Sequence, residues 1–129
     1  MEERWGTDVS GIMDITAIAK YVRISPRKAR DLARAIQGRT ASEALQVIEV
    51  NERKAARLIG KTLKSAIANA ENVHRVSVDG LRVKKAVVEP GPSLKRYWPR
   101  SRGMASPVLK RTSHIHIVLT DEPGARGRA

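Results

Sequence analysis

The sequence predicts a single α+β domain in which three helices pack on a small antiparallel sheet. Stretches near residues 14–23, 81–89 and 108–120 have the β-branched or alternating pattern of strands. Three segments between the first two stretches repeat apolar residues at helical spacing. A length of 129 residues suits one domain, and its core must come mainly from Ala, Val, Ile and Leu because aromatic residues total 3%.

The first strand is predicted in "DITAIAKYVR", residues 14–23, and a helix follows it closely. Ser25 is a good N-cap residue, and Pro26 suits the first helical position. Gly38 provides a stop. The apolar face between them is formed by Ala29, Leu32, Ala33 and Ile36. This pattern predicts a helix over roughly 26–37.

Two more helices are predicted. Thr40 and Glu43 have the spacing of a capping box, which indicates a short second helix within 40–50, with Ala44, Leu45, Val47 and Ile48 on its apolar face. Asn51 can cap a third helix over roughly 52–72. The apolar face of this third helix is Ala55, Ile59, Leu63, Ala66, Ile67 and Ala70, and a nearly opposite stripe holds Arg53, Arg57, Lys61 and Lys64. The many alanines indicate close helix packing or close approach to a partner.

The last two strands are consecutive along the chain, which favours antiparallel pairing. Asp79-Gly80 signals a turn before the strand at 81–89. In the strand at 108–120, the apolar residues Ile115, Ile117 and Leu119 alternate with His114, His116 and Val118. The expected domain therefore covers residues 14–120, between a flexible leader at 1–13 and a flexible basic tail at 121–129.

Residues 91–107, "GPSLKRYWPRSRGMASP", show neither helical nor strand periodicity. Prolines at 92, 99 and 107 restrict the backbone to extended or turn geometry. The cations are Lys95, Arg96, Arg100 and Arg102, without any acid, and Tyr97 and Trp98 are adjacent. Cations can contact phosphates and aromatic rings can stack on bases. We expect an extended basic arm that is disordered alone and ordered inside nucleic acid.

Charge is the strongest global signal, at a net +12 with a pI near 10.9. Residues 82–111 hold nine cations and one acid, and residues 23–64 hold eleven cations and four acids. Such clustering favours nucleic acid as the partner, ahead of an anionic membrane surface or a merely solvated basic surface. Cations around the start of the first helix are unfavourable, because that end of the helix dipole is already positive. A phosphate bound there would interact favourably with both the cations and the backbone N–H groups. That basic group is Arg23, Arg27, Lys28, Arg30 and Arg34.

The sequence offers no catalytic constellation. Cysteine is absent, which excludes disulfides and thiol chemistry. His114 and His116 share one face of a strand without the further ligands that a metal needs, so we expect a structural or RNA-facing role for them. No nucleophile elbow or phosphate-binding glycine motif is present. We therefore expect no enzyme, metal or cofactor, and no apolar run long enough for a membrane span is present.

Four motifs in order resemble one known family, the bacterial type of ribosomal protein number twenty-two of the large subunit. They are "AKYVRISPRKARDLARAIQG" (19–38), "KSAIANAEN" (64–72), "EPGPSLKRYWPRSRG" (89–103) and "LKRTSHIHIVL" (109–119). The resemblance implies a small α+β domain with a long β-hairpin arm, at about 82–112 here. It also implies that the hairpin runs through large-subunit rRNA and that its tip lines the nascent-peptide exit tunnel.

The resemblance and the cations above give one set of expected sites. The implied tunnel tip is Leu94, Lys95, Arg96, Tyr97, Trp98, Pro99, Arg100, Ser101, Arg102, Gly103 and Met104. The expected RNA-binding residues are Arg23, Ser25, Arg27, Lys28, Arg30, Arg53, Arg57, Lys61, Lys64, Lys84, Lys85, Lys95, Arg96, Tyr97, Trp98, Arg100, Arg102, Lys110, Arg111, Ser113 and His114. The implied partners are large-subunit rRNA, neighbouring ribosomal proteins and the nascent peptide, in cytoplasmic ribosomes, with neither a membrane nor a small-molecule substrate.

The chain departs from the family pattern near the tip. Met104 stands where a cation is usual, and Ser106-Pro107 replaces an acidic–basic pair, so the return strand is expected to be affected. Two other function classes compete with the ribosomal one. A free-standing basic architectural protein would bind DNA and RNA alike. A small nuclease would need clustered acids, which the basic regions lack.

Overall fold

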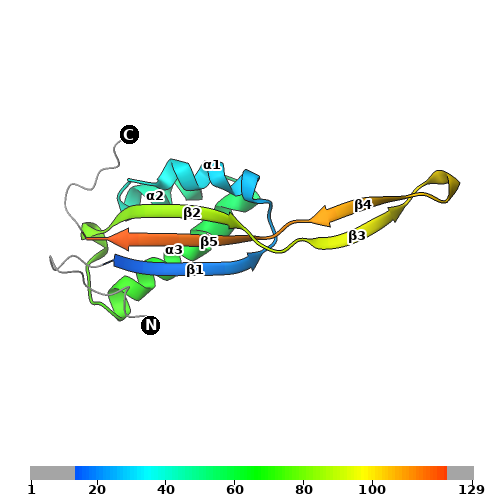
Figure 1. Cartoon of the computed structure of the whole chain (residues 1–129). Helices are drawn as coiled ribbons and strands as arrows, with labels where there is room; N and C mark the ends of the chain where they lie inside the picture. The colour runs from blue at the N-terminus through cyan, green and yellow to red at the C-terminus, as the bar shows by residue number, and fades with distance from the viewer. Residues whose placement is uncertain (1–13, 122–129) are drawn as a thin grey trace.

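A computed structural model describes residues 14–121. Three helices cover one face of a three-stranded antiparallel sheet, and a two-stranded arm projects away from this body (Figure 1). The predicted fold class, three helices on a small antiparallel sheet with a long hairpin arm, is therefore confirmed. The predicted leader at 1–13, and the predicted tail beyond Asp121, lie outside the described residues.

The sheet is built from β1 (Asp14–Val22), β2 (Arg82–Pro90) and β5 (Ser113–Thr120), in the order β1-β5-β2. Both edge strands run antiparallel to β5, which confirms the pairing expected for the last two body strands. The predicted alternation in β5 also holds, since its isoleucines and Leu119 are buried while its histidines are half-exposed. The buried residues face the helices and form one side of the core.

The first two helices are α1 (Pro26–Ile36) and α2 (Ala41–Glu49), within a residue or two of their predicted bounds. Ser25 caps α1, its Oγ accepting the Lys28 N–H at 3.4 Å. The capping box of α2 is complete, because Thr40 Oγ1 accepts the Glu43 N–H and a Glu43 carboxylate oxygen accepts the Thr40 N–H. Local signals therefore suffice to place these two starts.

The third helix, α3 (Lys54–Asn72), starts later than predicted. Asn51 is not its N-cap: Arg53 occupies that position without a side-chain bond. The Asn51 Oδ1 instead accepts the Arg53 N–H at 3.0 Å. An Asn side chain readily bonds the backbone two residues on, and here it forms a turn ahead of the helix.

The core lies between the sheet and the helices and consists almost entirely of Ala, Val, Ile and Leu, as the composition required. All of the predicted apolar residues of α1 and α3 are buried, and Ala44 and Ile48 anchor α2. Gly60 sits where α3 crosses α2: a Cβ there would lie 2.8 Å from Ile48 Cγ2. The two helices therefore pack closely at this glycine, which agrees with the first of the two alternatives that the alanines left open.

The residue pattern alone did not reveal the strands of the arm. Residues 91–107 show neither helical nor strand periodicity, yet they contain β3 (Leu94–Pro99) and the start of β4 (Ala105–Lys110), paired from Leu94↔Lys110 to Pro99↔Ala105, as the hairpin implied by the family resemblance requires. Strand periodicity arises when one face is buried, but the residues of β3 are exposed on both faces, so no alternation marked it. The predicted strand at 108–120 is likewise divided, with Arg111 and Thr112 between β4 and β5.

Candidate nucleic-acid interface

A cationic pocket lies where the arm meets the body. Its volume is about 330 Å³, and its lining is Arg23, Ile24, Ser25, Lys28, Lys54, Lys110 and Arg111. These residues come from the loop after β1, the first turn of α1, the start of α3 and the return side of the arm. Five cations and no acid line the pocket, so it has the chemistry of a phosphate site.

The start of α1 adds to this chemistry. Its first turn contains no acid to complement the helix dipole. Backbone N–H groups at a helix start favour a bound anion, as do the surrounding cations. The guanidinium of Arg53 donates to the Lys28 carbonyl at 3.3 Å and thereby ties the start of α3 to α1. The fold therefore brings the starts of two helices together beside the arm.

Sequence reasoning missed Lys54 and Lys20. Lys54 lines the pocket, and both lysines line a neighbouring groove of about 480 Å³ between β1 and α3, together with Arg23 and Lys61. Lys54 is the first residue of α3, and no local signal distinguishes it from other helix lysines. Only the packing of α3 against β1 and α1 could have identified it.

The predicted basic stripe on α3 faces a different surface. Arg57, Lys61 and Lys64 line a groove of about 420 Å³ between α2 and α3, where Glu49 contributes one acid. Lys61 also lines the β1 groove, so the two grooves adjoin across α3. The basic surface therefore extends from the pocket around this helix.

Other predicted contacts are not among the residues that line the pocket. Arg30 donates from Nε to the Val88 carbonyl at 3.4 Å, beside Arg34, on the side of α1 that covers β2. Arg27 is exposed on α1, and Lys85 is exposed on β2. Lys84 forms a 2.9 Å ion pair with Asp14, so its charge is offset within the protein.

The two aromatic residues of the arm point to opposite faces. Successive side chains of a strand alternate, and cross-strand partners share a face. The Trp98 face therefore contains Leu94, Arg96, Trp98, Ser106, Val108 and Lys110, and the Tyr97 face contains Lys95, Tyr97, Pro99, Ala105, Pro107 and Leu109. Tyr97 is 69% exposed and Trp98 is 61% exposed. Each face thus offers an aromatic ring beside a cation.

The turn of the hairpin occupies only part of the predicted tip Leu94–Met104, because the first six of those residues belong to β3. The turn itself is a 3₁₀ segment at Ser101–Gly103, with φ of 61° at Arg102 and 69° at Gly103. Arg100 closes it, donating from its backbone N–H to the Met104 carbonyl at 2.7 Å and from Nε to Ser106 Oγ at 3.0 Å. Pro107 leaves the return strand intact, since β4 already begins at Ala105.

Three predicted residues of β5 have partners inside the protein. Ser113 is fully buried and its Oγ donates to the Ile24 carbonyl at 2.6 Å, so this hydroxyl is engaged within the protein. His114 Nδ1 accepts the Tyr21 N–H at 3.1 Å. His116 Nε2 lies 3.2 Å from a carboxylate oxygen of Glu89. Residues 14–121 contain no group of three or more His, Cys, Asp or Glu side chains placed to hold a metal ion.

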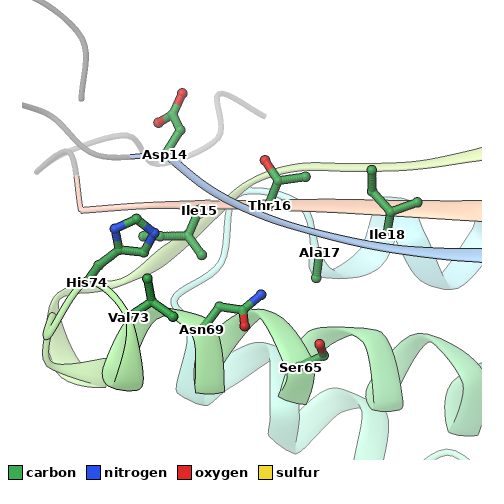
Figure 2. Close-up of a pocket in the computed structure, with 9 residues that line it drawn as sticks. All are labelled: Asp14, Ile15, Thr16, Ala17, Ile18, Ser65, Asn69, Val73 and His74. Carbon is green, nitrogen blue, oxygen red and sulfur yellow. The ribbon is translucent and has the colours of Figure 1, made fainter. Parts of the chain in front are cut away.

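Another hollow in the described part of the chain has a different lining. About 520 Å³ lies between β1 and the end of α3, and no Lys or Arg side chain lines it (Figure 2). Thr16 and Ile18 point away from α3 in this view, whereas Ser65 and Asn69 rise from the helix toward β1. The hollow therefore does not belong to the cationic surface. No helix within residues 14–121 is long and apolar enough to cross a membrane.

The family model and the relatives that match this sequence all belong to one ribosomal protein family. A family model described as "Ribosomal protein L22p/L17e" matches residues 17–120. "Large ribosomal subunit protein uL22" of Opitutus terrae is 53% identical over 109 residues, 84% of this chain and 96% of the relative. Proteins of the same name are 48% identical over 112 residues in Akkermansia muciniphila (87% and 100%) and 49% over 109 residues in a Thermotoga species (84% and 69%). The chain therefore belongs to the ribosomal protein L22p/L17e family, as its four motifs predicted.

Proposed function

We propose that this protein is a structural constituent of the large ribosomal subunit, which binds rRNA through the cationic pocket and the arm and catalyses no reaction. Its curated relatives are named as large-subunit proteins, which supports this assignment. The observation that carries the proposal is the pocket, where five cations from separate parts of the chain converge without an acid. A polyanion with closely spaced phosphates is the partner that such convergence favours.

The arm takes part in the same binding. Within residues 14–121 no helix or second sheet packs against either face, and both faces present an aromatic ring and a cation. A partner that contacted one face only would leave Tyr97 or Trp98 in water. We therefore infer that RNA surrounds the arm, with phosphates on its cations and bases or sugars against its rings.

The tip would then lie deep within the RNA. β3 has six residues of about 3.3 Å each, so the tip lies roughly 20 Å beyond Leu94, where the ladder of the arm begins. The family resemblance suggests that this tip lines the nascent-peptide exit tunnel, with Arg102 and Met104 near the peptide. The body, in turn, would contact neighbouring ribosomal proteins, and the protein would act in cytoplasmic ribosomes, supporting the assembly of the subunit.

A matched pair of lysine variants tests the RNA interface. Lys54→Ala should lower affinity for a large-subunit rRNA fragment and reduce the slope of log K against log salt by about 0.7–0.9, the value of one lost phosphate contact. Lys84→Ala should leave the slope unchanged because Asp14 already offsets that charge. The readout is fluorescence anisotropy across a salt series. Equal slopes for Lys54→Ala and the wild type would contradict a phosphate contact at the pocket.

Sedimentation separates the ribosomal role from the free-standing architectural one. Tagged protein expressed in cells should migrate with large subunits and remain there after a high-salt wash, because many contacts hold it within folded RNA. An architectural protein would dissociate in the wash and would bind duplex DNA as tightly as rRNA. Either of those two results would overturn the proposed function.

A further inference from the structure

The backbone ladder is interrupted where the arm joins the body. β2 and β5 pair as far as Pro90↔Ser113, and pairing resumes at Leu94↔Lys110. Three residues on the outgoing side, 91–93, thus lie opposite two on the return side, 111–112. A two-stranded junction without a regular ladder is a place where the arm could pivot, unless other bonds fix it.

Side-chain and backbone bonds close this gap. The Thr112 hydroxyl donates to the Pro92 carbonyl at 2.6 Å, and the Gly91 N–H donates to the Thr112 carbonyl at 2.9 Å. Thr112 is only 5% exposed, which is unusual for a residue at the root of an exposed arm. Gly91 permits this approach, since a Cβ there would lie 2.7 Å from Thr112 Oγ1.

His114 links the junction at Gly91 and Thr112 to the end of β1. Its Nδ1 accepts the Tyr21 N–H at 3.1 Å, and the two rings meet edge to face at 5.0 Å and 89°. Tyr21 has a φ of 57°, a left-handed conformation that a bulky side chain rarely adopts. A Cβ on Gly91 would lie 3.1 Å from the His114 ring, so the imidazole sits between β1 and the arm. The strained backbone is thus held in place by a contact to the arm root.

Ser113 connects the root to the cationic pocket. Its buried hydroxyl donates to the Ile24 carbonyl at 2.6 Å. Ile24 lies between Arg23 and Ser25, and all three line the pocket. Lys110 and Arg111, which precede Thr112 in the chain, line the pocket from the arm side. A change in arm direction would therefore move two of the pocket's five cations relative to the other three.

We propose that Tyr21, Gly91, Thr112, Ser113 and His114 form an arm-root clasp, whose task is to fix the direction of the arm relative to the cationic pocket before RNA binds. The clasp makes pocket and arm one preorganised RNA-binding unit, an inference that rests on the proposed function. These five are positioning residues, since they act through the cations and rings that contact RNA. Preorganisation raises affinity because less conformational freedom is lost on binding.

Distance measurements on the free protein test the clasp. The chain has no cysteine, so spin labels can be attached uniquely at Ser101→Cys on the tip and Ala68→Cys on the exposed side of α3. The doubly labelled protein, with no other change, should give a narrow distribution of distances between the labels. Gly91→Ala and Thr112→Val should each widen it about twofold, since each opens the junction to pivoting. Thr16→Val is the matched control, because Thr16 Oγ1 has no hydrogen-bond partner.

Affinity for the rRNA fragment is the second readout, and it should fall roughly tenfold in the two clasp variants and stay constant in the control. A wide distribution in the wild type would overturn the clasp. So would widths in Gly91→Ala and Thr112→Val that match the control. If Gly91→Ala fails to fold, Thr112→Val decides, since it preserves side-chain size. Wild-type protein that shows the expected distances but no affinity for rRNA would refute the proposed function while supporting the clasp as a positioning device.

Discussion

Tyr97 and Trp98 show at the residue scale how sequence neighbours can serve different surfaces. They are adjacent in the chain, and two adjacent rings could be expected to stack on the same nucleotides. In β3 their side chains lie on opposite faces of the arm, opposite Pro107 and Ser106 respectively. Each ring therefore has its own cationic neighbour, Lys95 on the Tyr97 face and Arg96 on the Trp98 face. We expect the two rings to contact different nucleotides.

A double-mutant cycle tests this separation. Tyr97→Ala and Trp98→Ala should each weaken rRNA binding by about 1–3 kcal/mol, the usual value of one aromatic stacking contact. The double variant should equal the sum of the two within about 0.5 kcal/mol, since residues on opposite faces share no partner. Binding titrations give the energies, and chemical probing of the RNA should show protections lost at two separate sets of nucleotides. Strong coupling, or one common set of nucleotides, would contradict the assignment of the rings to two faces.

At the scale of elements, the contact between α2 and α3 depends on the missing side chain of Gly60. A glycine inside a helix of 19 residues lowers its intrinsic stability by about 1 kcal/mol relative to alanine. Here it allows Ile48 of α2 to approach the α3 backbone closely. Ile48 is β-branched and stiff at its first side-chain torsion, so it cannot turn aside cheaply.

Gly60→Ala should therefore destabilise the protein although alanine is the better helix former. Overpacking typically costs about 1–3 kcal/mol, which exceeds the helix-propensity gain of about 1 kcal/mol, so the free energy of unfolding should fall by roughly 1 kcal/mol. Gly80→Ala is the control, since a Cβ there meets nothing within 4 Å. Urea denaturation followed by circular dichroism measures both variants. A stabilised Gly60→Ala variant would show that α2 moves away from α3 at little cost.

At the scale of the whole molecule, stability and RNA binding are divided between body and arm. The buried apolar residues of the described chain all lie in the body, and none falls between Val88 and Ile115. The arm has only its own ladder and turn to hold it, apart from the clasp at its root. Loss of the arm beyond the root should thus change what the protein binds far more than whether it folds.

Replacement of residues 95–109 by Asn-Gly tests this division, because that pair forms a tight hairpin turn between Leu94 and Lys110. The free energy of unfolding should stay within about 0.5 kcal/mol of the wild type, as for surface changes. The salt slope of rRNA binding should become shallower by about 3 to 4, since four cations are removed. Thermal unfolding and a salt titration provide the measurements. An unchanged slope would mean that the arm cations do not contact phosphates.

The sequence by itself determined the body of the fold. The strand pattern of β1, the caps of α1 and α2 and the apolar faces of the helices were all predicted, because a helix or sheet that buries one face must repeat apolar residues at its own period. The family motifs gave the arm and its place in the chain. Charge clustering indicated nucleic acid because an uncompensated surplus of cations favours a polyanion.

Only the tertiary structure decided which residues from distant parts of the chain lie together. Lys54 joins Arg23 and Lys110 in one pocket through the packing of α3, which no local pattern records. The residue pattern did not mark the arm strands, which only the family resemblance implied, because a ribbon exposed on both faces needs no apolar alternation. Ser113 was expected at RNA, yet its hydroxyl is buried against Ile24, because burial depends on the neighbouring strands and loops and not on residue type. Periodicity thus specifies the elements, whereas the contacts between distant elements specify the site.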